Sequence, residues 1–395
     1  MVPNGWKLTS LGEICSGNLQ TGPFGSQLHA HEYTDEGVPV LMPKDLIGYR
    51  ANNASAAKIP EHRADDLKKH TLRSGDLLFS RRGDVARFAL IESDYPRSLC
   101  GTGCLKATPN KAHSPLFLSY FLQKNAVKKW LEQNAVGQTM PNMNTAILTE
   151  LPLMVASSRE EEDKIAKILS TWDKAIAATE KLIETSKHQK KALMQQLLTG
   201  KKRLLNPETG KAFEGEWEEV KLGGISEITT GNSNREDSSL DAQYTFFDRS
   251  EDIRTSSRYL FDSEAVIVAG EGQDFVPKHF EGKFDLHQRT YAIMNFEKSF
   301  GKFLYYYIGY YRHYFLAQAV GSTVKSLRLP MFQKMPISLP IIEEQQKIAS
   351  VFTVADKEIA ALETKLAHFN QEKKALMQQL LTGKCRVKVD DMEVA

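Results

Sequence analysis

Arginine, lysine, asparagine and glutamine side chains stand in short polar loops at matching places in the two halves of a 395-residue chain. Arginine or lysine can hold guanine, and asparagine or glutamine can hold adenine, through hydrogen bonds to the base edge. Glycine and serine residues in the same loops would let the backbone come close to phosphates. We therefore predict nucleic-acid contacts by Thr21, Gly22, Ser26, Gln27, Ser80, Arg81, Arg82, Gln138, Thr139, Asn142 and Asn144 in the first half, and by Asn232, Asn234, Arg235, Ser322, Thr323, Lys325 and Arg328 in the second.

The pair Arg81 and Arg82 is the most specific of these candidates, because it directly follows the apolar run 76–80. Such a run predicts a strand, and a turn at its end would project both guanidiniums toward base edges or phosphates. The corresponding place in the second half is Gly270-Glu271-Gly272, which has no arginine and which we interpret as a hairpin-type turn. Glycine, serine and asparagine also form ordinary turns, so the prediction depends on the loops matching in both halves.

Motifs for catalysis or cofactor binding are missing from the sequence. There is no Gly-x-x-x-x-Gly-Lys-Ser/Thr phosphate loop, and the pair Gly270 and Gly272 lacks the third glycine of a dinucleotide fingerprint. Cys100 and Cys104 are spaced like two metal ligands, but no cysteine or histidine pair completes a zinc set, so we expect buried thiols. No Ser/His/Asp constellation is evident either. We expect a chain without a catalytic site, a metal or a cofactor of its own.

The composition limits the other function classes. The 51 basic and 49 acidic residues give a net charge of +2, so a polyanion would have to be held by local patches and not by the overall field. A hydrophobic content of 41% is typical of a folded protein, and no apolar run approaches the roughly 18–20 residues of a membrane helix. Four cysteines in this length do not make a disulfide framework. We expect a cytoplasmic protein with no membrane partner.

An internal repeat gives the domain organisation. The eleven residues of 190–200 recur without change at 373–383, and the pattern that begins at Trp6 recurs at Trp217. The chain is two copies of one plan, each a variable globular part followed by a nearly invariant tail. We predict a first globular domain at 1–155, a long helix at 156–200, a linker at 201–216, a second globular domain at 217–340, a second long helix at 341–384 and a C-terminal tail at 385–395.

Both tails have the spacing of long amphipathic helices. Their apolar positions alternate steps of four and three residues through more than four heptads, which predicts a coiled coil. The predicted seam residues are Ile165, Leu169, Trp172, Ile176, Ile183, Leu193, Leu197, Ile348, Phe352, Ile359, Leu362, Leu366, Phe369, Leu376 and Leu380. Each helix could instead pack only on its own globular part, but a strip of about 32 residues spans ~48 Å, more than a small domain covers. The pattern therefore favours two helices that cover each other.

The globular parts have the pattern of mixed α/β domains, so the whole chain is predicted to be α+β. Short apolar strands are expected at 38–42, 76–80, 88–91 and 265–269. Single helices are expected at 116–133 and 303–319. The second helix is rich in tyrosine, which could form a stacking surface for bases, although such residues more often belong to a core.

Two variable domains, each followed by a helix that ends in Lys-Lys-Ala-Leu-Met-Gln-Gln-Leu-Leu-Thr-Gly, resemble the specificity subunit of type I restriction-modification enzymes. The openings at Trp6 and Trp217 and the segment Thr21-Gly-Pro-Phe-Gly-Ser26 are similar to the target-recognition domains of that family. The resemblance implies a pseudo-twofold repeat in which each domain reads one half of a split target in double-stranded DNA. It also implies that the two helices pair antiparallel and act as a spacer.

The same resemblance implies the partners. Two methyltransferase subunits that use S-adenosylmethionine would dock on the chain, and restriction subunits that use ATP and Mg would join the full enzyme. The second domain has no equivalent of Arg81 and Arg82, so its base contacts do not follow from position. Two other functions stay open: a nucleic-acid enzyme in its own right, and a coiled-coil scaffold that binds only protein.

Overall fold

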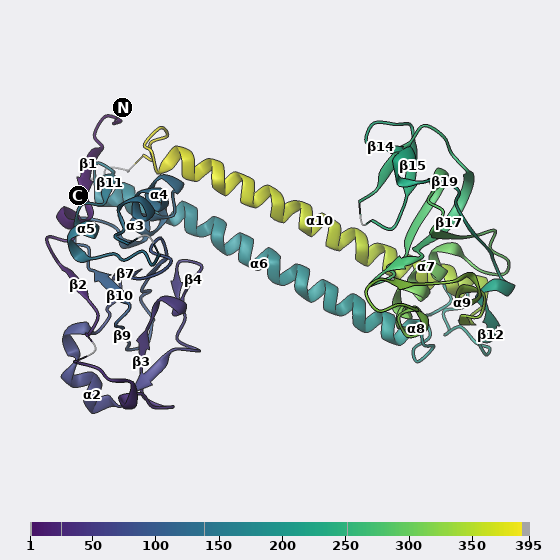
Figure 1. Cartoon of the computed structure of the whole chain (residues 1–395), viewed down its shortest axis with the longest axis horizontal. Coiled ribbons are helices and arrows are strands. Elements are labelled where there is room, and N and C mark those ends of the chain that lie inside the picture. The colour runs from purple at the N-terminus through teal and green to yellow at the C-terminus, as the bar shows by residue number, and fades with distance from the viewer. Residues whose placement is uncertain (1, 25, 138, 251, 389–395) are drawn as a thin grey trace. The chain divides into compact units, whose positions relative to one another are not determined.

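Residues 2–24, 26–137, 139–250 and 252–388 are described by the structure, a computed structural model shown in Figure 1. Their contacts divide the chain into two compact units. The first unit contains the described residues up to Ala178 and those from Leu366 onward, and the second contains Thr179–Lys365. Each unit therefore combines one globular domain with a part of each long helix. Among the described residues, no helix is long and apolar enough to cross a membrane.

The first globular domain is built on a six-stranded sheet. Its strands are, in spatial order, β2 (Leu19–Thr21), β10 (Cys104–Ala107), β7 (Leu77–Ser80), β8 (Phe88–Leu90), β5 (Arg50–Ala51) and β4 (Leu46–Ile47). A three-stranded sheet has the order β6 (Ala57–Ile59), β3 (Val38–Leu41) and β9 (Leu99–Cys100), and β1 (Lys7–Ser10) pairs antiparallel with β11 (Pro152–Val155). The short helices are α1 (Leu11–Ile14), α2 (Glu61–Asp66), α3 (Pro115–Leu122), α4 (Asn125–Asn134) and α5 (Thr145–Thr149). The central strands β7, β8 and β10 are buried along their whole length, so their ends are fixed in position.

The second globular domain is built on a seven-stranded sheet. Its strands are, in spatial order, β13 (Glu227–Thr230), β20 (Thr290–Met294), β17 (Phe261–Ala269), β19 (Lys278–Leu286), β15 (Tyr244–Phe247), β16 (Arg254–Ser256) and β14 (Ser238–Ser239). Two small sheets pair β12 (Glu218–Lys221) with β22 (Pro336–Leu339) and β18 (Glu271–Gly272) with β21 (Lys325–Ser326). The short helices are α7 (Gly301–Tyr310), α8 (His313–Gln318) and α9 (Leu329–Gln333). The predicted mixed α/β character of both domains is confirmed.

The predicted strands at 38–42, 76–80, 88–91 and 265–269 are confirmed as β3, β7, β8 and β17. The prediction of two single helices was wrong. The first breaks before α4, where Lys124 has an extended backbone (ψ 137°) and its Nζ donates to the Leu381 carbonyl oxygen at 3.4 Å. The second breaks between α7 and α8, which lets Phe315 turn into the core against Phe332, with the ring centroids 4.6 Å apart. In the predicted aromatic helix Phe303, Tyr306 and Tyr307 are buried in the core, and the other tyrosines are half-buried against it.

Helices α6 (Arg159–Leu197) and α10 (Ile342–Leu380) are each continuous over 39 residues, or about 58 Å. They run antiparallel within each unit (Figure 1). In the first unit Asp173 pairs with Lys373, and the Trp172 and Phe369 rings meet edge to face at 5.5 Å. In the second unit Lys190 and Lys187 of α6 pair with Asp356 and Glu363 of α10, at 2.5 and 2.7 Å. The antiparallel pairing that the resemblance implied is therefore present.

All of the predicted seam residues are buried or half-buried. They divide into two groups. Some pack on a globular domain and others pack on the partner helix, so each of the two interpretations of the heptad pattern is correct in part. Ile165 and Leu169 lie in the core of the first domain, and Ile348 and Phe352 lie in the core of the second. Residues nearer the middle of the helices, such as Trp172, face the partner helix.

Each invariant tail packs on the globular domain of the other repeat. Leu380 and Leu381 of the second tail belong to the core of the first domain, and Leu197 and Leu198 of the first tail belong to the core of the second. Both tails end at a glycine with positive φ, which is 68° at Gly200 and 65° at Gly383. A Cβ atom on Gly383 would lie 2.9 Å from the Trp6 ring, so glycine is needed both for the turn and for the contact.

Candidate nucleic-acid interface

Backbone hydrogen bonds bring the three predicted loops of the first domain together. The end of β7 contacts the third loop directly, because the Arg81 carbonyl accepts from the Met143 N–H at 2.8 Å. It also contacts the turn before β10, because the Arg81 N–H donates to the Gly103 carbonyl at 2.8 Å. Gly22 donates to the Cys104 carbonyl at 3.0 Å, next to the same strand end. A Cβ atom on Gly22 would lie 1.8 Å from the Gly101 carbonyl oxygen, so only glycine permits this approach.

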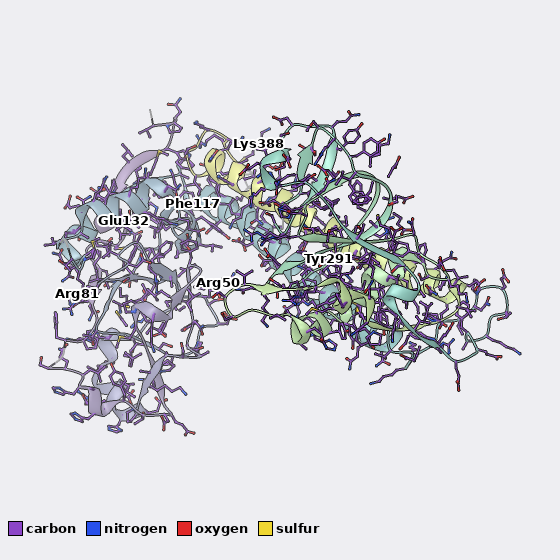
Figure 2. The ribbon with its side chains drawn as sticks, turned by 45° about the vertical axis from the view of Figure 1, so that its right-hand side comes forward. Arg50, Arg81, Phe117, Glu132, Tyr291 and Lys388 are labelled. Atoms are coloured by element: carbon purple, nitrogen blue, oxygen red, sulfur yellow. The ribbon has the colours of Figure 1, made fainter. Side chains whose placement is uncertain are left out.

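The two arginines of this cluster have different surroundings. The Arg81 guanidinium lies 5.7 Å from the centroid of the Phe24 ring, and Phe24 is 51% exposed. Arg81, which is labelled in Figure 2, is half-buried. Its Nε is buried without a hydrogen-bond partner among the described residues. Arg82 is exposed. The predicted strand-end position of both residues is confirmed, and Phe24 holds the first guanidinium beside the Thr21 loop.

Several other predicted residues of the first domain hold the loops in shape. Ser80 is fully buried and its hydroxyl donates to the Arg82 carbonyl at 3.0 Å, so its side chain does not face a ligand and this part of the prediction was wrong. The Asn144 side chain caps α5, because its Oδ1 accepts from the Ile147 N–H at 2.8 Å, and the Gln27 side chain accepts from the Phe24 N–H at 3.1 Å. Ser26, Thr139 and Asn144 are exposed, and Thr21, Gln27 and Asn142 are half-buried. Gln138 lies outside the described residues.

The three predicted loops of the second domain also meet. Strand β18 pairs with β21, and the Leu327 N–H donates to the Gly270 carbonyl at 2.7 Å, as Met143 does to Arg81 in the first domain. Glu271 and Gly272 are therefore a short strand, and the predicted hairpin-type turn was wrong. The Thr230 loop joins through the turn between β19 and β20, because the Gln288 N–H donates to the Ser233 carbonyl at 3.0 Å.

The predicted side chains of the second domain are mostly exposed, and several have partners. Asn234 accepts from the Gln288 amide at 2.6 Å, and Asn232 accepts from the Arg258 guanidinium at 3.2 Å. The Arg235 Nε lies 3.9 Å from Asp248. Ser322, Thr323 and Arg328 are exposed, and Lys325 is half-buried in β21.

Two arginines that the sequence reasoning missed lie beside this cluster. Arg249 follows β15 and Arg289 follows β19, and both contact the Glu271 carboxylate. Each stands in a turn after a strand, which was the signal that singled out Arg81. The strands β15 and β19 were not predicted from the sequence, so this signal did not point to Arg249 and Arg289.

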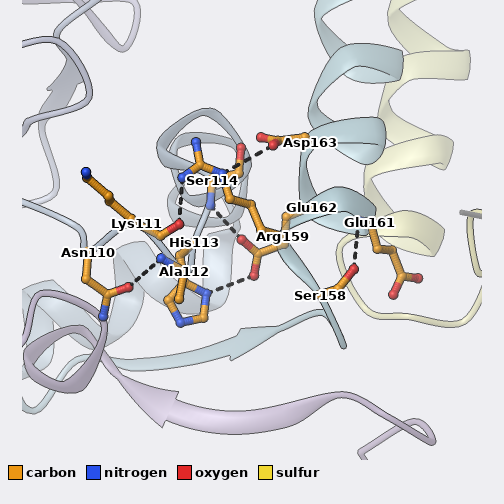
Figure 3. A network of polar contacts seen from close by, with 10 residues as sticks. All are labelled: Asn110, Lys111, Ala112, His113, Ser114, Ser158, Arg159, Glu161, Glu162 and Asp163. Carbon is orange, nitrogen blue, oxygen red and sulfur yellow. Dashed lines mark hydrogen bonds and ion pairs between the residues drawn. The ribbon is translucent and has the colours of Figure 1, made fainter. Parts of the chain in front are cut away.

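Polar contacts at the start of α6 fix this helix to the domain that carries the loops (Figure 3). The buried Glu162 carboxylate accepts from the Ser114 N–H at 2.7 Å and lies 3.1 Å from Nδ1 of His113. Arg159 donates to the Lys111 carbonyl at 2.6 Å. In the second unit the equivalent residue is Gln345, which accepts from the Phe300 N–H at 2.8 Å.

The described residues offer no cluster of three or more potential metal ligands. Cys15, Cys100 and Cys104 are buried, as expected for Cys100 and Cys104. Burial raises the pKa of Cys15 and of Cys100 to about 12, and it raises the pKa of Cys104 further. These thiols are protonated at neutral pH and are poor nucleophiles.

Comparisons with known proteins point to one family. The family model described as "Type I restriction modification DNA specificity domain" matches residues 3–187 and 214–369. The chain is 27% identical to the type I restriction enzyme MjaX specificity subunit assigned in Methanocaldococcus jannaschii, over 98% of this chain and 95% of the relative. It is 29% identical to the type I restriction enzyme EcoDI specificity subunit of Escherichia coli, over 42% of this chain and 37% of the relative.

Solved structures share the fold. The S subunit of a type I restriction-modification system from M. genitalium has a TM-score of 0.65 at 15% identity, covering 96% of this chain and 97% of that one. The HsdS subunit from Thermoanaerobacter tengcongensis has a TM-score of 0.52 at 17% identity, covering 97% and 98%. Because the family model matches both repeats and most of the sequence, the chain belongs to the family of type I restriction-modification DNA specificity subunits.

Proposed function

We propose that this chain selects the DNA target of a type I restriction-modification enzyme, with each globular domain reading one half of a split site. The observation that carries the proposal is the set of three loops that meet in each unit. The same backbone contacts join them, since Met143 donates to Arg81 in the first domain and Leu327 donates to Gly270 in the second. The side chains on the loops differ between the domains. An equivalent backbone arrangement with different loop side chains suits two domains that recognise two different base sequences.

The two invariant tails support the docking of two methyltransferase subunits on the chain. Residues 190–200 and 373–383 are identical, and each segment packs on a globular core in the same way. Two equivalent surfaces on one chain suit two copies of one partner. S-adenosylmethionine is assigned to these partners, and ATP and Mg are assigned to restriction subunits in the full complex, on the family resemblance.

We also propose that the helices set the number of unread base pairs between the two half-sites. The support is their continuity, because a 39-residue helix without a break has a fixed length of about 58 Å. The antiparallel ion pairs in each unit hold the register of α6 against α10. The length of the helices and the identity of the loops would then control separate features of the target.

A domain duplication tests the proposal. The second globular domain, 217–340, is replaced by a second copy of residues 1–155, and the variant is expressed with its methyltransferase partner. The identical tails give the new copy the surface on which the original domain packed. Methylation mapping should show a symmetric target, with the first half-site present twice in inverted orientation. Methylation of the original asymmetric target by an active variant would refute the assignment of one half-site to each domain.

A further inference from the structure

A group of charged side chains surrounds strand β18 in the second domain. We call it the arginine cluster and define it as Arg235, Arg249 and Arg289 with Asp248, Glu271 and His287. The residues come from separate segments of the chain, and together with Gln288 they line a cavity of about 220 Å³. The three arginines exceed the two carboxylates in charge, so the cluster attracts anions although the whole chain carries only +2.

Glu271 holds two of the arginines. Arg289 Nη1 lies 2.5 Å from one carboxylate oxygen, and Arg249 Nη1 lies 3.4 Å from the other. The Glu271 side chain is 16% exposed, whereas the Arg249 and Arg289 side chains are 55% and 62% exposed. A guanidinium has five N–H donors, so most donors of both arginines still face solvent. The carboxylate therefore fixes the direction of two guanidiniums whose other donors are available to a ligand.

Asp248 supplies an unused acceptor at the same place. Its side chain is 3% exposed, and Oδ1 accepts from the Ser250 N–H at 2.7 Å. Oδ2 has no hydrogen-bond partner among the described residues and lies 3.9 Å from Arg235 Nε. A buried carboxylate oxygen that lacks a hydrogen bond is costly, so a donor that enters the cavity would be bound favourably.

His287 is a neutral member of the cluster. Burial lowers its pKa, and the charges of Arg249 and Arg289 lower it further against the opposing effect of Asp248 and Glu271. Its Nδ1 accepts from the Arg289 N–H at 3.1 Å, which fixes the turn on which this arginine stands. At neutral pH the histidine thus positions Arg289 and adds no charge.

The cluster occupies the place that Arg81 and Arg82 occupy in the first domain. In both domains a strand end accepts a hydrogen bond from the loop that follows a short helix, α4 in the first domain and α8 in the second. The Met143 N–H donates to the Arg81 carbonyl, and the Leu327 N–H donates to the Gly270 carbonyl. The second domain has a glutamate at this place instead of an arginine. The glutamate gathers arginines from two neighbouring turns, so guanidiniums stand at the recognition surface of both domains.

We propose that the arginine cluster reads a G·C base pair of the second half-site, with Arg249 and Arg289 donating to O6 and N7 of guanine and Asp248 accepting from the amino group of cytosine. This inference rests on the proposed function. Guanine presents two acceptors and cytosine one amino donor on the same edge of the pair in the major groove. The donors and the unused acceptor of the cluster match this pattern. Exposed ion pairs contribute little to folding stability, so the contacts to Glu271 act mainly by orienting the guanidiniums before DNA binds.

Methylation mapping of variants, expressed with the methyltransferase partner, tests this inference. The native chain should recognise a second half-site that contains at least one required G·C pair. Arg289→Ala and Arg249→Ala should each reduce the preference for that pair over the other base pairs by ~5- to 150-fold, as expected for loss of a base contact. Arg289→Lys keeps the charge but loses the planar guanidinium whose direction Glu271 fixes, so it should retain affinity for DNA and still lose the preference. Arg312→Ala, which changes an exposed arginine of the same unit, is the matched control and should leave the target unchanged.

Glu271→Gln tests the positioning role. It removes the charge that holds both arginines, so the G·C preference should fall while the first half-site stays fully recognised. An unchanged second half-site in the Arg249, Arg289 and Glu271 variants, or a native second half-site of A·T pairs only, would overturn the inference and leave the proposed function standing. A native chain that directs no methylation to a split target would instead refute the proposed function itself. Recognition of the first half-site by each variant shows that the variant is folded and assembled.

Discussion

Replacement of Arg203 by alanine should leave the carboxylate of Glu344 buried without its counter-ion. Arg203 follows the first invariant tail, and its Nε and Nη2 donate to the two oxygens of Glu344 at 2.7 and 2.6 Å. Its third contact is a hydrogen bond from Nη1 to the Gly215 carbonyl at 2.8 Å. The Glu344 side chain is fully buried and the Arg203 side chain is 22% exposed. This pair fixes the tail of one helix to the start of the other within the second unit.

The size of the expected loss of stability follows from the burial of the ion pair. Breaking a buried ion pair by removing one partner costs ~3–5 kcal/mol, because a charge is left in the interior. Arg203 is partly exposed, so we expect about 3 kcal/mol, at the lower end of that range. The equivalent pair of the first unit, Arg386 with Glu161, offers a matched comparison. Arg386 is 44% exposed, so water can replace it more easily and Arg386→Ala should cost less, about 1 kcal/mol.

Hydrogen exchange resolved by peptide is the suitable assay, because the two units need not unfold together. In Arg203→Ala, amides of the second unit that exchange only by unfolding should exchange about 100-fold faster, since each 1.4 kcal/mol is a factor of ten. Peptides of the first unit should be unaffected. Adding Glu344→Gln removes the stranded charge and should restore much of the protection. Unchanged protection in Arg203→Ala, or equal losses in Arg203→Ala and Arg386→Ala, would refute the argument from burial.

Four further predictions concern target reading, pH, spacing and assembly. Alanine at Arg81 or Arg82 should weaken specific DNA binding by ~1–3 kcal/mol if the residue reads a base; unchanged affinity and target in both variants would make them surface residues only. Burial lowers the pKa of His70 to about 4, and an unfolded histidine titrates near 6.5, so stability should fall as the pH drops from about 6.5 to 4. His70→Gln should reduce this loss, so its melting temperature should depend less on pH between about 6.5 and 4 than that of the native chain. The same pH dependence in both proteins would contradict the prediction. Removing one heptad from each helix shortens each helix by ~10 Å, which corresponds to about three base pairs. The number of unread base pairs should therefore fall, or binding should be lost. An active variant that keeps the original spacing would show that the helices do not set it. Mass measurement of the saturated complex should give two methyltransferase subunits per chain. A one-to-one complex would contradict the proposal that both invariant tails dock a methyltransferase.

The long-range organisation of this chain could be predicted from sequence because it is repeated. Identity between residues 190–200 and 373–383 defined the two halves, and the heptad spacing defined the helices. The seam was only partly resolved, since residues such as Ile165 and Phe352 face a domain core and not the partner helix. An apolar position is compatible with either neighbour, so its spacing alone does not distinguish them.

The loop clusters could be predicted only where neighbours in sequence are also neighbours in space. Arg81 and Arg82 follow a strongly apolar strand, so their place at a strand end was evident. Arg249 and Arg289 meet only because the chain folds their two turns toward Glu271. That arrangement depends on the strand order, which a single sequence does not provide. Ser80 shows the opposite error, since a polar residue next to two arginines is buried as a support of their turn.

Sequencing that detects methylated bases, applied to DNA from cells that carry this chain with its methyltransferase partner, tests the central claim most directly. The account predicts methylation confined to one split target, with two specific half-sites separated by a fixed number of unread base pairs. A continuous target, or methylation that does not change when this chain is replaced by another specificity subunit, would contradict it.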